Sequence, residues 1–340
     1  MKTLAPNSRI SWIDMAKGYG TILVILAHLL NGGMLRLWIY TFHMPLFFFL
    51  SGYVFSTKND FKTFVKKKCK SIVIPYFCLG VPMVLYELCT KAQNGVVTIQ
   101  ETLNSFLRLI VQNRLWTLWF IACLFFLNIL FYGVAKLCKT DLQIAIASIV
   151  MLLVGLLYAS IGGPSLPWNV DVCFTTIPFF AVGYLYKRHV EKIDSLLEKR
   201  LVAIGVFVVS AILNLVCGMK SIDSTFTGLE MFYSKYGNPV YTYLSAFAGI
   251  ICMVLISKAI TIKPIRYIGE NSMLYYAWHQ TIWMPVLKGL MTAVGLGQLM
   301  YLGVWGNVLY MIIWLLGIIV VSTICDWGIK KAGWKFMLGK

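Results

Sequence analysis

Ten apolar segments, each about as long as a membrane-spanning helix, constrain the fold of this chain more than any other feature. A bilayer core about 30 Å thick needs roughly 20 apolar residues per helix, and lipid-exposed backbone must satisfy its own hydrogen bonds. The alternating pattern of a membrane β-barrel is absent. The sequence therefore predicts an all-α polytopic membrane protein with about ten transmembrane helices. The segments are 18–35, 37–56, 72–90, 116–137, 142–160, 169–186, 201–218, 239–257, 267–287 and 305–326.

The composition excludes the soluble classes of protein. Hydrophobic residues make up 59% and charged residues 13% of the 340 residues, whereas a soluble domain carries about 25% charge. The nine cysteines form no C-x-x-C motif or Cys/His cluster, which argues against a disulfide framework and a metal site. No internal repeat or Ser/Gly-rich linker interrupts the chain, so we expect a single domain over residues 1–340.

The strong positive charge has a topological explanation. The net charge is +17. With the N-terminus in the cytoplasm, ten spans place 23 Lys and Arg residues in the inner connections and 7 in the outer ones. This is the positive-inside distribution, and it predicts that both ends of the chain are cytoplasmic. The charge thus requires the lipid bilayer as a partner and no nucleic acid, and it leaves the oligomeric state open.

Two connections are expected to form helices of their own. Residues 60–71 (DFKTFVKKKCKS) place Phe61, Phe64 and Val65 at helical spacing among lysines, which predicts an interfacial helix on the cytoplasmic face. It could bind anionic lipid or the phosphates of a nucleotide-like cofactor. Residues 97–111 predict an amphipathic helix on the outer face.

Three of the four histidines lie inside apolar segments, where polar groups are costly and mark functional sites. A rise of about 1.5 Å per residue puts His28, His43 and His279 about 16, 22 and 20 Å from the cytoplasmic edge, in one layer. His189 lies in a basic connection. A neutral imidazole is well suited to remove a proton from a hydroxyl at neutral pH.

Helical periodicity extends the pattern around His28. Lys17 and Asp14 lie about 20° and 40° from His28 around the helix axis, so the three share one helix face. Asp14 and Lys17 are equally well explained as an ion pair at a helix start. Pro45, two residues after His43, predicts a kink or a helix start.

Further polar positions accompany the other segments. Ser51-Gly52 allows close backbone approach, which in membranes is often a helix contact. Ser272, Tyr275, Tyr276 and His279 lie within one stripe of the ninth segment. Trp119 fits either an outer aromatic belt or a substrate site.

Five motifs give the chain a recognisable likeness over nearly its whole length. They are ISWIDMAKGYGTILVILAHLL, IYTFHMPLFFFLSGYVF, KKKCKSIVIPYF, LWTLWFIACLFF and YIGENSMLYYAWHQ. With these motifs the chain resembles the acyltransferase-3 family of membrane acyltransferases, and within it the fucose 4-O-acetylase-like and capsular-polysaccharide O-acetyltransferase branch.

The resemblance implies a multi-pass enzyme of a bacterial cytoplasmic membrane. It would transfer an acetyl group from cytoplasmic acetyl-CoA to a hydroxyl of a surface glycan or its lipid-linked precursor. The family's basic residue–ten residues–histidine motif falls on Lys17 and His28, and its preceding aspartate falls on Asp14. Its basic pair falls on Lys67 and Lys70, where other members usually have arginine.

These likenesses and patterns give the expected site. The catalytic residues are His28, His43 and Asp14; the donor-binding residues are Lys17, Lys67, Lys68, Lys70 and Ser51; the acceptor-binding residues are Trp119, Ser272, Tyr276 and His279. No metal is expected. Some members carry an extracytoplasmic hydrolase-like domain, and we expect this chain to work without one.

A different class of function also fits a polytopic chain with buried polar residues. A transporter of a lipid-linked glycan or a small solute would show them too, although the sequence lacks the matched halves typical of such carriers. The sequence does not specify the acceptor sugar, the hydroxyl position or the acyl chain length. It also does not distinguish direct transfer from a reaction through an acetyl-enzyme.

Overall fold

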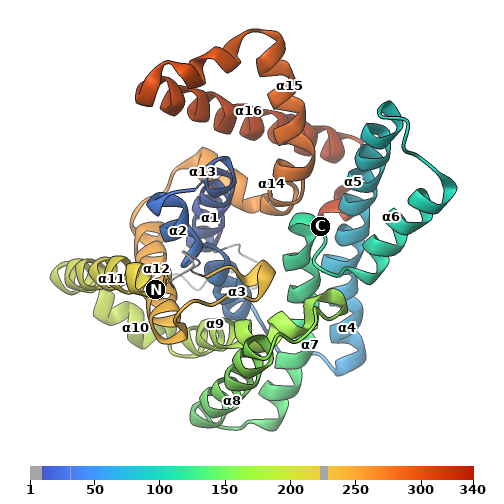
Figure 1. Ribbon diagram of the computed structural model, residues 1–340. Coiled ribbons are helices and arrows are strands. Elements are labelled where there is room, and N and C mark those ends of the chain that lie inside the picture. Colours follow the sequence, from blue (N-terminus) through green and yellow to red (C-terminus); the bar gives the residue numbers. More distant parts are fainter. Residues whose placement is uncertain (1–9, 31, 223–228) are drawn as a thin grey trace.

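The computed structural model describes residues 10–30, 32–222 and 229–340, and it folds these ranges into sixteen α-helices with short 3₁₀ and π turns. Figure 1 shows their arrangement. The helices are α1 Ser11–Leu29, α2 Met34–Tyr40, α3 His43–Tyr53, α4 Phe61–Lys68, α5 Ile74–Gln93, α6 Ile99–Val111, α7 Trp119–Leu137, α8 Asp141–Ser160, α9 Val170–Arg188, α10 Val190–Leu197, α11 Arg200–Ser221, α12 Pro239–Ala259, α13 Lys263–Glu270, α14 Ser272–Trp278, α15 Met284–Ala293 and α16 Gly303–Lys331.

The all-α membrane fold is confirmed, and each of the ten apolar segments coincides with helix. In the described ranges, seven helical stretches are long and apolar enough to cross a membrane; they are Met34–Tyr53, Phe61–Gln93, Ile99–Leu137, Asp141–Ser160, Arg200–Ser221, Pro239–Ala259 and Gly303–Lys331. The stretches outside this set are α1, α9 and the broken ninth segment. Polar residues reduce the hydropathy of α1 and α9, which are largely buried by neighbouring helices. Ten spans and cytoplasmic ends remain predictions.

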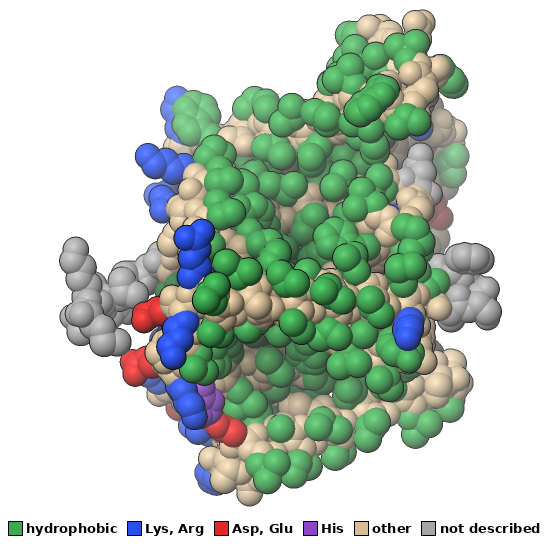
Figure 2. All heavy atoms as spheres, turned by 90° about the vertical axis from the view of Figure 1, so that its left-hand side faces the viewer, with side chains coloured by type: hydrophobic (Ala, Val, Ile, Leu, Met, Phe, Trp, Pro, Cys, Tyr) green, Lys and Arg blue, Asp and Glu red, His purple; other side chains and the backbone are tan. Residues whose placement is uncertain are grey.

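Four helices form the centre of the molecule, and long apolar helices surround them. Helices α1, α3, α9 and α12 pack against one another in the middle of Figure 1, while α8, α11 and α16 lie at the periphery. The peripheral helices expose large apolar side chains such as Leu157, Leu201 and Ile324. Figure 2 shows the resulting hydrophobic surface, with Lys and Arg gathered along one edge and few at the other. One-sided charge of this kind is expected of a membrane protein.

Local capping explains where several helices begin. The side chains of Thr98 and Thr140 accept hydrogen bonds from backbone N–H groups of α6 and α8, and Gln143 completes a capping box with Thr140. Asp60 caps α4 by accepting from the Thr63 backbone, and hydrogen bonds from Thr63 lower the pKa of Asp60. Such caps satisfy first-turn donors that have no partner within the helix. The amphipathic helix predicted at 97–111 is confirmed as α6.

Two predicted boundaries are wrong. The first segment was expected at 18–35, but α1 runs from Ser11 to Leu29, because Asp14 lies buried inside the bundle. The interfacial helix expected over 60–71 is not separate: α4 continues into α5 through a π turn at Cys69–Val73. Pro75 follows this turn, and proline lacks the N–H that an α-helical register needs.

Glycines set the closest helix contacts. A Cβ at Gly269 of α13 would overlap the carbonyl oxygen of Asp14, and one at Gly18 would overlap that of Ile265. On the other side of the core, a Cβ at Gly52 would overlap the carbonyl oxygen of Phe180. The Ser51-Gly52 pair therefore lies at the contact of α3 with α9, as small residues often do in membrane helices.

Candidate active site

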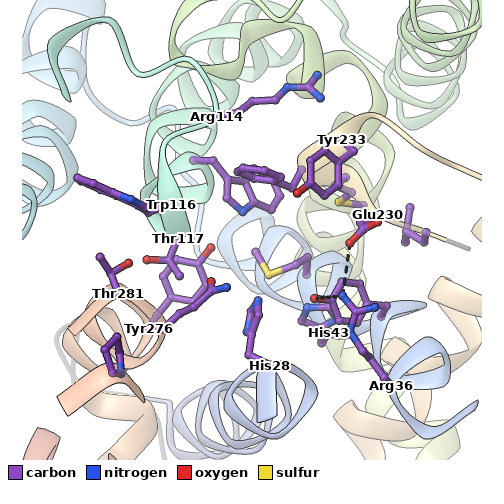
Figure 3. A pocket seen from close by; sticks show the side chains of 18 of the residues that line it. His28, Arg36, His43, Arg114, Trp116, Thr117, Glu230, Tyr233, Tyr276 and Thr281 are labelled. Atoms are coloured by element: carbon purple, nitrogen blue, oxygen red, sulfur yellow. Dashed lines mark hydrogen bonds and ion pairs between the residues drawn. The ribbon is translucent and has the colours of Figure 1, made fainter. Parts of the chain in front are cut away.

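A cavity of about 570 Å³ lies at the end of α1 away from Asp14 and Lys17. The connections that border it are those predicted to be extracytoplasmic. In Figure 3, His28, His43, Tyr276 and Arg114 converge on this space from different elements. The lining residues are His28, Arg36, Tyr40, His43, Met44, Arg108, Arg114, Trp116, Thr117, Trp119, Leu229, Glu230, Met231, Phe232, Tyr233, Tyr276, Gln280, Thr281 and Pro285.

His28 lines the cavity from the last turn of α1. Its Nδ1 lies 2.9 Å from the carbonyl oxygen of Val24. A carbonyl oxygen only accepts, so Nδ1 of the neutral ring carries the proton and donates to Val24. Nε2 is then left with a free lone pair, which is the form that a general base requires.

His43 also lines the cavity, and its Nδ1 is likewise hydrogen-bonded to a backbone carbonyl. The second segment breaks between α2 and α3, and His43 is the first residue of α3, so the helix start predicted from Pro45 is confirmed. The Nδ1 of His43 lies 2.9 Å from the carbonyl oxygen of Ile39 and donates to it. The Nε2 of a neutral His43 is therefore a hydrogen-bond acceptor. Hydrogen-bond donors to a ligand in the cavity must come from other side chains, such as Tyr276 or Thr281.

His279 lies behind His28. It is fully buried, it begins the π turn His279–Trp283, and Pro285 follows that turn. Its Nε2 lies 3.0 Å from Nδ1 of His28, and its own Nδ1 lies 2.8 Å from the carbonyl oxygen of Tyr276. The structure thus brings together two histidines that are 251 positions apart in the sequence.

Charged side chains surround the outer part of the cavity, each held by a carboxylate. Arg36 lies 3.5 Å from Glu230 and donates to the Tyr40 hydroxyl at 3.1 Å. Arg114 pairs with Asp171 at 2.6 Å, and their side chains are only 14% and 3% exposed. These residues were not expected from the sequence. The sequence offered one signal for them: a carboxylate, Asp171, at the start of an apolar segment. Its partner Arg114 is recognised only in the structure.

The loop that carries Arg114 has an unusual backbone. Gln112, Arg114 and Trp116 all have positive φ angles, of 47°, 53° and 46°. Such conformations are strained for residues other than glycine and persist only when the surroundings fix them. The side chain of Gln112 accepts the Leu115 N–H at 2.7 Å, and Arg114 is fixed by Asp171. The strained loop therefore holds Trp116 in the cavity wall.

The expected site residues fall into two groups. Of the expected set, His28, His43, Trp119 and Tyr276 line the cavity, with His279 directly behind. Asp14 and Lys17 lie at the other end of α1, about 21 and 16 Å from His28 along the helix axis.

The remaining expected residues also lie outside the cavity lining. Ser51 donates to the carbonyl of Phe47 at 2.8 Å. Ser272 begins α14. Tyr275 points toward α16, where its hydroxyl contacts Thr323 at 2.7 Å.

The basic connection exposes two of its expected donor-binding lysines and half-buries the third. Lys67 donates to Asn59 at 3.0 Å and is exposed, as is Lys70, while the ammonium of Lys68 lies 5.5 Å from the ring of Phe64. Asn271, the residue that follows α13, accepts a hydrogen bond from Lys330 at 2.7 Å. Lysines 330 and 340, which both contact Asn271, were not among the expected site residues.

These features define a multi-pass membrane protein with a polar cavity built around a histidine pair. Comparison with known proteins gives its family. The family model described as an acyltransferase domain, Acyl_transf_3, matches residues 10–327, and the chain belongs to this acyltransferase-3 family. The family resemblance inferred from the motifs is confirmed.

A curated relative supports the same family. The chain is 29% identical over 205 residues to nodulation protein NolL of Sinorhizobium fredii (strain NBRC 101917 / NGR234), an alignment that covers 55% of this chain and 51% of the relative. The chain thus spans about half the length of this relative. No solved structure matches the chain.

Proposed function

We propose that the protein transfers an acetyl group from cytoplasmic acetyl-CoA to a sugar hydroxyl of a surface or lipid-linked glycan, in a bacterial cytoplasmic membrane. The observation that carries the proposal is His28, whose unprotonated Nε2 belongs to a ring that lines a polar cavity. Removal of the hydroxyl proton by a positioned imidazole is the step an O-acyltransferase most needs.

The walls of the cavity suit a sugar. Trp116, Trp119 and Tyr276 offer apolar ring surface with polar edges, which is how aromatic side chains contact amphipathic partners. The Arg36–Glu230 pair adds donors and acceptors for hydroxyl groups. Because each cavity arginine already has a carboxylate partner, the site favours an uncharged sugar.

The donor would approach from the other end of α1. Lys17, Lys67, Lys68 and Lys70 remain the proposed contacts for the phosphates of CoA, as ammonium groups that bind phosphate oxygens. The pantetheine arm would bring the thioester up to His28, over about 16 Å measured along α1 from Lys17. On this side, Asp14 would orient or charge-balance the approaching donor, and Ser51 would contact it.

The proposed reaction balances with His28 as the only proton carrier. Nε2 of His28 takes the proton of the sugar hydroxyl while that oxygen attacks the thioester carbonyl. The carbon–sulfur bond then breaks, and the proton on Nε2 passes to the CoA thiolate. A hydroxyl from the cavity wall, such as that of Tyr276, would stabilise the tetrahedral oxyanion.

The test is NMR of surface glycan from cells that carry the wild-type chain, His28→Ala, His189→Ala or no chain, with matched membrane expression. His189 is exposed and serves as the control histidine. We expect an alkali-labile O-acetyl signal with the wild type and His189→Ala only. An equal signal with His28→Ala would contradict the role of His28, and no signal in any strain would contradict a surface-glycan acceptor.

A further inference from the structure

The contact between His28 and His279 defines the protonation state of both rings. Nδ1 of His279 lies 2.8 Å from the Tyr276 carbonyl, which can only accept, so Nδ1 carries the proton and Nε2 is a lone pair. That lone pair lies 3.0 Å from Nδ1 of His28. The N–H of His28 is therefore shared between two acceptors, the Val24 carbonyl oxygen and Nε2 of His279.

We propose that His279 is a positioning residue, which acts through His28 and does not touch the acceptor. It holds the His28 ring with Nε2 toward the cavity, and it accepts from Nδ1–H when His28 becomes positively charged. The role deepens the proposed function and depends on it, because it concerns the base of that same reaction. It replaces the expectation, drawn from the sequence, that His279 binds the acceptor.

The chemistry resembles that of an aspartate behind a catalytic histidine, with a neutral acceptor in its place. When Nε2 of His28 takes the hydroxyl proton, the ring becomes an imidazolium and its Nδ1–H becomes a charged donor. Hydrogen bonds from charged donors are roughly twice as strong as neutral ones. The contact with His279 thus strengthens as the transition state forms, which affects kcat more than substrate binding.

The surroundings of His279 are rigid enough for this role. Thr117 donates to the carbonyl of Ala277 at 2.7 Å, and the indole N–H of Trp278 donates to the carbonyl of Leu79 at 2.9 Å. These bonds fix the two residues before His279 to α5 and to the cavity wall. The π turn that begins at His279 is a local irregularity of the kind often found at functional sites.

The first arm of the test measures kinetics in membrane vesicles, with radiolabelled acetyl-CoA and base-treated surface glycan as acceptor. The variants are His279→Leu, which cannot accept a hydrogen bond, His279→Gln, whose amide oxygen can, and His189→Gln as control. We expect His279→Leu to lower kcat about 100-fold with KM for acetyl-CoA within about two-fold. His279→Gln should recover a large part of the loss, and His189→Gln should match the wild type.

The second arm does not need activity. Nitrogen-15 NMR of histidine-labelled protein in lipid bilayers reports which ring nitrogen carries the proton, and the His28→Ala spectrum assigns the His28 signals. All three proteins should show His28 protonated at Nδ1, because the Val24 carbonyl still accepts from it. The nitrogen-15 shift of that Nδ1 should be nearly the same in the wild type and His279→Gln, and should move in His279→Leu, which lacks the second acceptor.

Two results would overturn the proposal: an unchanged His28 Nδ1 shift in His279→Leu, or kcat within about two-fold of wild type in that variant. If the wild type transfers no acetyl group although the Nδ1 shift moves as expected, the glycan acetyltransferase function fails and the histidine contact stands.

Discussion

Each of the three buried histidines uses the same local device. Nδ1 of His28 and of His43 donates to the carbonyl four residues earlier, and Nδ1 of His279 donates to the carbonyl three residues earlier. An apolar setting makes an unpaired N–H expensive, so the preceding helical turn satisfies it. The consequence is chemical, because all three rings keep Nε2 as the unprotonated nitrogen, which in His279 accepts from His28.

The buried pair Arg114–Asp171 should contribute strongly to stability. Asp171→Ala leaves the guanidinium of Arg114 without its carboxylate in a site only 14% exposed, and loss of one partner of a buried pair costs about 3–5 kcal/mol. We expect a clear fall in Tm of the detergent-solubilised protein. The matched control is Asp141→Ala, whose pair with Arg188 has side chains 37% and 40% exposed and should contribute at most about 1 kcal/mol. Equal Tm values for both variants would contradict the structural role of Arg114.

The residues proposed to carry the chemistry all lie at a helix end or at a helix irregularity. His28 occupies the last turn of α1, His43 the first position of α3, and His279 the first position of a π turn. Backbone that departs from α-helix inside a membrane protein must be enclosed by protein or border a wet cavity. These irregular helix ends are therefore tolerated because they border the cavity or are enclosed by protein.

Close packing of α1 on α13 should not tolerate a side chain at Gly269. The added methyl of Gly269→Ala would overlap the Asp14 carbonyl oxygen, so α1 and α13 must separate and carry His28 with them. We expect loss of the monodisperse peak in size-exclusion chromatography. Gly205→Ala on α11, where the new Cβ meets nothing within 4 Å, should behave as wild type. A normal peak and normal activity for Gly269→Ala would show that the two helices are not so closely packed.

At the scale of the molecule, apolar helices enclose polar ones. The central helices α1 and α9 carry the carboxylates Asp14 and Asp171, both buried, whereas the peripheral helices expose aliphatic side chains. Charge is gathered at one edge of the hydrophobic surface in Figure 2. The cavity and Lys17 lie at opposite ends of α1, as the proposed two-sided reaction requires.

The sidedness can be tested with single cysteines in a cysteine-free background. Asn94 and Lys192 are both exposed and lie in connections predicted to be outside and inside. We expect Asn94→Cys to react with a membrane-impermeant maleimide in intact cells, and Lys192→Cys to react only after permeabilisation. The opposite pattern would invert the topology, and labelling of both cysteines in intact cells would contradict the span count.

Much of the fold and part of the site could be predicted from local sequence. The ten apolar segments predict the helices, and Pro45 predicts the helix start at His43. The common layer of the histidines predicts that His28 and His279 lie near each other, although not which nitrogen faces which. The first helix boundary was misplaced, because charged residues were assumed to lie in water when α13 buries Asp14.

The sequence by itself determined the class of structure, because apolar length and helical periodicity are local properties that a bilayer reads directly. Only the tertiary structure decided the site. The contact of His28 with His279, the pairing of Arg114 with Asp171 and the placement of Arg36 beside Glu230 join residues distant in the sequence. Such contacts depend on how helix surfaces and strained loops pack in three dimensions, and no local pattern in the chain records that packing.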